Sequence, residues 1–210
     1  MRVGIIGVGI VGDATKKVLE EFHEIFPYDK YKESYNSEEN LNRLAKNSEV
    51  VFICVSTPMK PNGEMDYSSV YNSLDSLQKK VEETRRDPQG ILIIIRSTAV
   101  SGSTDKCAEK YPFRFTFNPE FLRERCAFED MKNTDRIVIG ANSLEDYEKV
   151  VEIYHPIFPN ARYINVDRKT AEMIKYVANV MLTGQIAVAN EIHQICKVNG
   201  IDYDKVKEAV

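Results

Sequence analysis

The sequence predicts an α/β protein: a doubly wound parallel sheet of the Rossmann type, followed by a long α-helix. Three observations support this prediction. Apolar, strand-like segments alternate with amphipathic helical segments through the first three quarters of the chain, as in a parallel sheet flanked by helices. Residues 50–55 and 91–95 are apolar without alternation, which is typical of central strands covered on both faces. After Val166 a single long helical pattern begins.

The expected elements follow in regular order. The strands are residues 3–6, 25–28, 50–55, 91–95, 113–117, 136–139 and 162–166. The helical segments between them lie near residues 11–22, 37–46, 67–84, 102–110 and 144–154. Short connections with right-handed crossovers place such helices on both faces of the sheet. Residues 58–65 and 86–90 contain proline and glycine, so we expect loops there.

The last part of the chain is expected to be one long helix over residues 168–198, which contain no proline. At about 1.5 Å per residue it would be roughly 45 Å long. Its apolar residues cover more than one narrow stripe, which predicts a homodimer through this helix. Asn199-Gly200 indicates a helix stop, and Asp202 can cap one more short helix. The expected parts are a Rossmann domain (1–166), a connecting and dimerisation helix (167–200) and the start of a further helical element (201–210).

Composition narrows the class of protein. The chain has 210 residues, of which 43% are hydrophobic and 29% charged, and its formal net charge is −4. This mildly acidic balance argues against nucleic-acid binding, which needs a clustered basic face. No apolar run reaches the roughly 18 residues that span a bilayer, so we expect no membrane segment. The four cysteines have neither Cys-x-x-Cys nor zinc spacing, which indicates reduced thiols in a cytoplasmic protein without a metal site.

A Gly-x-Gly-x-x-Gly motif occupies residues 7–12, directly after the first strand and at the start of a helix. In this context Gly7 permits the tight turn, Gly9 lets the backbone approach a pyrophosphate, and Gly12 lets helix and strand pack closely. The helix N-terminus then offers free N–H groups to the anion. The motif therefore predicts a dinucleotide cofactor.

An acidic residue at the end of the second strand indicates which dinucleotide. Asp29 can accept hydrogen bonds from the adenosine ribose and would repel a 2′-phosphate. We therefore expect NAD, while the neighbouring Lys30 and Lys32 keep NADP open as an alternative.

Five segments carry a more specific pattern: residues 50–58, 96–98, 118–124, 136–140 and 171–179. Asn-Pro-Glu-Phe-Leu-Arg-Glu at 118–124 is followed by Ala-Glu-Met-Ile-Lys-Tyr-Val-Ala-Asn at 171–179. In this order the segments resemble the UDP-glucose/GDP-mannose dehydrogenases. The resemblance runs the length of the chain and covers only the N-terminal part of that family's usual architecture.

The resemblance implies NAD-dependent oxidation of a nucleotide sugar at C6, from alcohol through aldehyde to carboxylate. In the family, a cysteine captures the aldehyde as a thiohemiacetal, a second hydride leaves to give a thioester, and water hydrolyses it. The matching catalytic residues are Thr98, Glu120, Glu124, Lys175 and Asn179. The expected cofactor-binding residues are Gly7, Gly9, Ile10, Val11, Gly12, Asp29, Ser56, Thr57, Pro58 and Thr98, and the expected substrate-binding residues are Phe121, Leu122 and Arg123.

Three of the catalytic residues fit their roles physically. Lys175 and Asn179 lie one turn apart on one helix, where an ammonium and an amide N–H can stabilise an oxyanion. Thr98 follows the carboxyl end of a strand, where its hydroxyl can orient a water. The ordinary alternatives are a solvated or Glu172-paired Lys175, a helix-packing Asn179 and a helix-capping Thr98.

The two glutamates are expected to lie close together. Asn118 can cap a helical turn that begins at Pro119, which would place Glu120 and Glu124 one turn apart. Two neighbouring carboxylates can differ in pKa, so that one can act as a base towards substrate or water while the other stays ionised. The alternative is that both serve only as helix or surface charges.

Some positions depart from the family pattern. Ile10 stands where tyrosine is common, residues 99–101 read Ala-Val-Ser, and Arg125 stands where glycine is usual. The Gly-rich segment with the family's nucleophilic cysteine would lie beyond residue 210, and Cys126 fits a packed thiol. We therefore expect the chain to be cut shortly after Gly200, and to bind NAD without completing the oxidation alone.

Two rival functions remain. A β-hydroxyacid dehydrogenase of the 6-phosphogluconate type also joins a Rossmann domain to a helical one, but residues 118–124 argue against it. A non-catalytic NAD-binding module is the other rival. Which nucleotide sugar is the substrate stays open.

Overall fold

The computed structural model describes residues 1–210 in two compact units, Met1–Lys175 and Tyr176–Val210. The first unit holds a seven-stranded sheet with the strand order β2-β1-β3-β4-β5-β6-β7. The strands are β1 (Arg2–Ile6), β2 (Glu24–Tyr28), β3 (Val50–Ile53), β4 (Leu92–Ile95), β5 (Arg114–Phe117), β6 (Arg136–Gly140) and β7 (Arg162–Val166). Each expected strand is present, and the predicted doubly wound α/β fold is confirmed.

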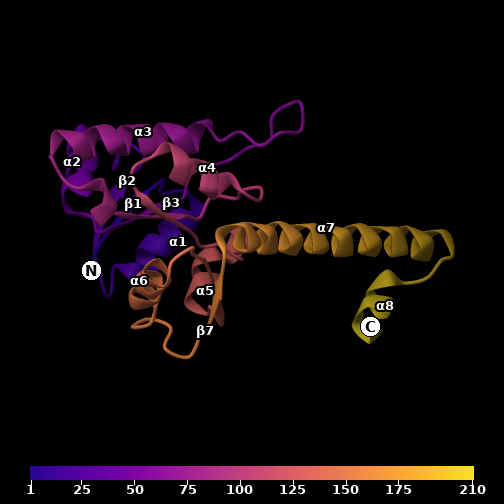
Figure 1. Ribbon diagram of the computed structural model, residues 1–210. Helices are drawn as coiled ribbons and strands as arrows, with labels where there is room; N and C mark the ends of the chain where they lie inside the picture. Colours follow the sequence, from indigo (N-terminus) through magenta and orange to yellow (C-terminus); the bar gives the residue numbers. More distant parts are fainter. The chain divides into compact units, whose positions relative to one another are not determined.

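Helices cover both faces of the sheet (Figure 1). One face carries α2 (Glu38–Asn47), α3 (Ser68–Glu83) and α4 (Ser103–Lys110). The other face carries α1 (Ile10–Leu19), α5 (Ala127–Lys132) and α6 (Leu144–Tyr154). Every residue of β3 and β4 is buried between these layers, as their continuous apolar sequences predict.

Strand β6 departs from the expected parallel arrangement. It runs antiparallel to β5 and pairs with it only through Phe117 and Gly140, whereas all other neighbouring strands are parallel. The connection between them holds a 3-10 turn, η2 (Glu124–Cys126), and the unpredicted six-residue helix α5. A helix of this length spans only about 9 Å, so the chain stays at the carboxyl end of the sheet and enters β6 from that side.

The chain passes from β7 into the long helix α7 (Arg168–Val198), whose bounds agree with the expected helix. Its first turns belong to the sheet-containing unit and pack closely on β6. A Cβ atom on Gly140 would lie 2.6 Å from the Cβ of Ala171 and 3.0 Å from the Cα of Arg168. Ala171 is fully buried, so glycine at position 140 is what permits this contact.

The second unit contains the remainder of α7 and the short helix α8 (Tyr203–Ala209). The expected helix stop is present, with Gly200 in the left-handed region at φ +67°. The Asp202 carboxylate caps α8 by accepting a hydrogen bond from the Asp204 N–H at 3.1 Å. No helix in the chain combines the length and the apolar content that crossing a membrane requires.

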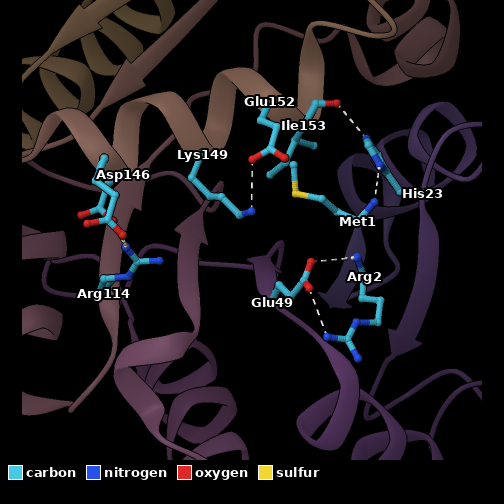
Figure 2. A network of polar contacts seen from close by, with 10 residues as sticks. Met1, Arg2, His23, Glu49, Arg114, Asp146, Lys149, Glu152 and Ile153 are labelled. Atoms are coloured by element: carbon cyan, nitrogen blue, oxygen red, sulfur yellow. Dashed lines mark hydrogen bonds and ion pairs between the residues drawn. The ribbon is translucent and has the colours of Figure 1, made fainter.

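Polar contacts join the amino ends of the first strand and its neighbours (Figure 2). The Arg2 guanidinium pairs with the Glu49 carboxylate at 3.1 Å. The His23 Nε2 atom lies 2.8 Å from the Ile153 carbonyl oxygen of α6, and its Nδ1 lies 3.3 Å from the Met1 nitrogen. Ligands bind at the carboxyl ends of the strands in such folds, and these contacts lie at the opposite end of the sheet.

Candidate cofactor and catalytic site

The glycine motif has the geometry that its sequence predicts. Gly7 has φ +90°, and a Cβ atom there would lie 2.8 Å from the Cys54 carbonyl group. A Cβ on Gly12 would lie 1.9 Å from the Gly7 carbonyl oxygen. Gly9 precedes α1 and has no atom within 4 Å of its Cβ position, which leaves the approach to the helix N-terminus open. The first and third glycines are therefore required by the fold, and the second leaves space for a ligand.

Asp29 ties the glycine motif to the end of β2. Its Oδ2 accepts a hydrogen bond from the Val8 N–H at 2.7 Å, and its Oδ1 accepts from the Tyr31 and Lys32 N–H groups at 2.8 and 3.0 Å. A carboxylate offers about four acceptor positions. Asp29 can therefore hold the loop in place and still accept a hydrogen bond from a ribose hydroxyl.

Two adjoining cavities lie at the carboxyl ends of β1, β3 and β4, and together we call them the cofactor cleft. Its first part, of about 220 Å³, is bordered by Asp29 and the glycine motif, and its second part measures about 500 Å³. The two parts share Gly9 and residues 54–56. Of the expected cofactor-binding residues, those that line the second part are Gly9, Ile10, Val11, Ser56, Thr57, Pro58 and Thr98. Gly12 packs beneath the cleft without lining it.

Helix α3 contributes a row of polar residues that the sequence interpretation missed. Ser69, Asn72, Ser73 and Ser76 line the first part of the cleft, beside Asp29. Their spacing of three and four residues places them on one face of a helix, a signal that was visible in the sequence.

The segment after β4 places Thr98 in the second part of the cleft. The Ser97 hydroxyl donates to the Val55 carbonyl oxygen at 2.6 Å, and the Thr57 hydroxyl donates to the Thr98 carbonyl oxygen at 2.8 Å. The Thr98 hydroxyl itself has no hydrogen bond within the chain and is half-buried. It is therefore free to bind a ligand or a water.

Glu120 and Lys175 form a buried ion pair where the second part of the cleft ends. The Lys175 Nζ lies 2.7 Å from the Glu120 Oε1, and the two side chains are only 7% and 11% exposed. The Glu120 Oε2 accepts a hydrogen bond from the Leu122 N–H at 2.8 Å, and Glu120 and Thr98 line the same cavity. Three of the five expected catalytic residues are thus brought together, and Lys175 pairs with Glu120 instead of Glu172.

The prediction of a helical turn after Asn118 is wrong. Residues 118–123 have no regular structure, because the Asn118 side chain is buried in long-range hydrogen bonds and cannot cap a helix. Its Oδ1 accepts from the Arg96 guanidinium and the Tyr154 hydroxyl, and its Nδ2 donates to the Val138 carbonyl oxygen at 2.7 Å. These bonds join β4, β5, β6 and α6.

The two remaining catalytic candidates, Glu124 and Asn179, are both exposed. Glu124 begins the 3-10 turn η2, is exposed and makes no hydrogen bond or ion pair, so the expected one-turn spacing from Glu120 is not formed. Asn179 belongs to the second unit and is exposed. Their catalytic assignments stay predictions.

The expected substrate-binding residues line a separate cavity. Phe121, Leu122 and Arg123 border a space of about 430 Å³, which shares Arg96 and Glu120 with the cofactor cleft. The Arg123 guanidinium pairs with the Asp130 carboxylate at 2.7 Å and lowers the pKa of that carboxyl to about 2. Because Glu120 lines both this cavity and the cofactor cleft, it lies where the two border each other.

None of the four cysteines provides a reactive thiolate in the cleft. Cys54 lines it, but burial raises the pKa of its thiol to about 12, so the sulfur stays protonated near neutral pH. Burial likewise raises the pKa of Cys107 to about 11, and Cys196 is buried. The Cys126 Sγ lies 3.8 Å from a carboxylate oxygen of Asp130, outside the cofactor cleft.

A doubly wound sheet with a glycine-rich turn and an acid at the end of the second strand defines a dinucleotide-binding domain. Residues 28–158 match the NAD binding domain of the UDP-glucose/GDP-mannose dehydrogenase family, and residues 169–210 match the central domain of the same family. The chain belongs to the UDP-glucose/GDP-mannose dehydrogenase family. The expected family and the expected cofactor, NAD, are confirmed.

Individual relatives agree with this assignment. The chain is 38% identical over 175 residues to UDP-glucose 6-dehydrogenase of Rickettsia bellii (strain RML369-C), a match that covers 80% of this chain and 39% of the relative. It is 32% identical over 172 residues to UDP-glucose 6-dehydrogenase TuaD of Bacillus subtilis (strain 168), which covers 78% and 35%. The chain thus spans about two fifths of the length of these relatives.

Solved structures show the same fold. A GDP-mannose dehydrogenase from Pseudomonas aeruginosa has a TM-score of 0.85 and 26% identity, and the match covers 100% of this chain and 56% of that chain. A UDP-glucose dehydrogenase from Pyrobaculum islandicum has a TM-score of 0.85 and 25% identity, and the match covers 99% and 56%.

Proposed function

We propose that this chain supplies the NAD site and part of the catalytic site for the oxidation of a nucleotide sugar at C6. The observation that carries the proposal is the buried Lys175–Glu120 pair beside Thr98 at the end of the cofactor cleft. Burying two charges is costly, and a hydrophobic pair would often be at least as stable. A buried ion pair in a ligand cleft is therefore better explained by chemistry than by stability.

The residues of the cleft suit a hydride-transfer reaction. NAD, held by the glycine motif and Asp29, would supply the acceptor for the hydride that leaves the C6 carbon of the sugar. An ammonium has three N–H donors, so Lys175 can bond to Glu120 and still stabilise negative charge on the C6 oxygen. The Glu120 carboxylate can accept the proton that the C6 hydroxyl loses, and the Thr98 hydroxyl can orient a water. Glu124 and Asn179 complete the set by resemblance to the family.

The sugar is proposed to occupy the cavity bordered by Phe121, Leu122 and Arg123. Because Glu120 lines both this cavity and the cofactor cleft, a sugar held there would meet the cofactor at Glu120.

The four cysteines form no disulfide, which supports the expected cytoplasmic location.

Replacement of Lys175 tests the proposal. In the complete enzyme, Lys175→Ala should lower turnover of the nucleotide sugar by roughly 10² or more, because the oxyanion loses its charged donor. Steady-state production of NADH measures the effect. Lys169→Ala is the matched control, since Lys169 lies on the same helix with 64% of its side chain exposed and should retain the rate. An unchanged rate in Lys175→Ala would mean that Lys175 only stabilises Glu120.

We also propose a homodimer formed through α7. The helix exposes many apolar side chains in the second unit, a pattern that soluble monomers seldom tolerate. They are Val177, Val180, Met181, Leu182, Ile186, Val188, Ile192 and Ile195. Light scattering at micromolar concentration should give twice the mass of one chain, and a stable monomer would contradict the proposal.

A further inference from the structure

Glu172 is a fully buried carboxylate that the proposed mechanism does not use. Its Oε1 accepts hydrogen bonds from both the N–H and the hydroxyl of Thr104, each at 2.7 Å, and its Oε2 accepts from the Gly102 N–H. No lysine or arginine pairs with it. All three bonds instead lead to the start of helix α4.

The start of α4 is well suited to hold a carboxylate. The first N–H groups of a helix have no partner within the helix, and the helix dipole favours a negative charge there. Gly102 precedes α4 with φ +89°, a conformation that favours glycine, and glycine has no side chain that could cap the helix. The missing cap comes from Glu172 on α7, 70 residues further along the chain.

Neighbouring contacts strengthen the same junction between α4 and α7. The Arg168 Nε pairs with the Asp105 Oδ1 at 2.7 Å, and the Ser101 hydroxyl donates to the Lys169 carbonyl oxygen at 3.2 Å. Residues 101–105 are thus fixed to the first turns of α7 by several contacts. Glu172 makes the most buried of them.

The position of Glu172 relates it to two residues of the proposed site. Thr98 lies four residues before Gly102, and its carbonyl is fixed by Thr57. Lys175 lies three residues after Glu172 on the same helix, and its ammonium pairs with Glu120. One carboxylate therefore connects the segment that carries Thr98 to the helical turn that carries Lys175.

We propose that Glu172 is a positioning residue that holds Thr98 and Lys175 in fixed relation at the second part of the cleft, where the nicotinamide of NAD would lie. The inference rests on the proposed function, because it takes Thr98 to face the cofactor and Lys175 to face the substrate. Asp29 and the glycine motif, which border the adenosine end, do not depend on this junction. Loss of Glu172 should therefore weaken one end of the cleft and spare the other.

Binding of two nucleotides to Glu172→Gln tests the proposal. The glutamine amide nitrogen would face N–H donors, so at least one of the three hydrogen bonds is lost. ADP contains the adenosine and the pyrophosphate but no nicotinamide. By titration calorimetry, the Kd for NAD should rise about tenfold and the Kd for ADP should change by less than about twofold.

Two further variants control the experiment. Asp105→Asn removes the pair with Arg168 at the same junction but keeps the bonds to Glu172, so its NAD affinity should stay within about twofold of the wild type. Glu172→Asp keeps the charge and should recover part of the loss. If Glu172→Gln does not fold, Thr104→Val removes one of the three bonds and should raise the Kd for NAD by about twofold to threefold, with ADP unchanged.

The outcomes separate this inference from the proposed function. An equal loss of NAD and ADP binding in Glu172→Gln, or no loss of either, would overturn the positioning role. Failure of the wild-type chain to bind NAD would instead contradict the proposed cofactor site.

Discussion

The two ends of the cleft are held by different kinds of contact. Residues 7–12 are fixed by backbone geometry, since Gly7 has φ +90° and Gly12 leaves no room for a side chain. Residues 118–123 lack regular structure and are fixed by side chains from distant elements, among them Tyr154 and Lys175. The proposed adenosine end therefore depends mainly on glycine geometry and on one carboxylate, Asp29, whereas the proposed sugar end depends on several distant side chains. Substitutions should damage the two ends in different ways.

The largest effect is expected at Gly12. In Gly12→Ala the new Cβ would meet the Gly7 carbonyl oxygen at 1.9 Å, so the turn must move and the N–H groups at the start of α1 lose their arrangement. NAD affinity, which we expect in the micromolar to millimolar range for the wild type, should fall by about 10² or more. Titration calorimetry measures it, and circular dichroism reports whether the variant remains folded.

Two other glycines sharpen this prediction. Gly9→Ala should weaken NAD binding without loss of thermal stability, since its Cβ position is open and borders the cleft. The Cβ position of Gly90 is also open but lies far from the cleft, so Gly90→Ala should change neither NAD affinity nor thermal stability. If Gly12→Ala and Gly9→Ala both bound NAD like the wild type, the glycine motif would not be part of the NAD site.

A smaller effect, on stability, is expected at Asn118. Asn118→Ala removes the acceptor for Arg96 and Tyr154 and the donor to Val138, all in the buried interior. An unsatisfied buried polar group costs about 1–3 kcal/mol, so the free energy of unfolding should fall by about 2–3 kcal/mol. Urea denaturation measures the loss. NAD affinity should stay within about threefold, because the adenosine end has its own support.

Asn133→Ala is the control for Asn118→Ala, since Asn133 is exposed and donates only to the Glu129 carbonyl oxygen at 2.9 Å. Its stability should be close to that of the wild type. If Asn118→Ala weakened NAD binding as strongly as Gly12→Ala, the two ends would not be held independently.

The difference between the two ends of the cleft also explains which parts of the structure could be predicted from the sequence. The glycine motif, Asp29 and the strands around them follow from local patterns, because a turn with φ > 0 or a continuous apolar strand is determined by the residues within it. The long helix was equally predictable from its periodicity and from Gly200. For these parts, neighbouring residues in the chain are also the ones that decide the structure.

The sugar end could not be predicted in this way. Asn118 before Pro119 is a good local signal for a helix start, but bonds to Arg96 and Tyr154, 22 and 36 residues away, override it. The partner of Glu172 lies at Gly102 and Thr104, and no local pattern relates them. Likewise, β6 runs antiparallel to β5 because the short helix α5 keeps the connecting chain at the carboxyl end of the sheet. This depends on the assembled sheet and not on a local pattern.

Gly140 has a consequence for the proposed chemistry although it touches none of the proposed catalytic residues. The turn of α7 that includes Ala171 rests directly on the backbone of β6 at this glycine, and Lys175 lies one turn further along the same rigid rod. The contact at Gly140 thus determines how far the Lys175 ammonium lies from the sheet. A single methyl group at position 140 would raise the rod, and the ammonium would then no longer meet the Glu120 carboxylate at 2.7 Å.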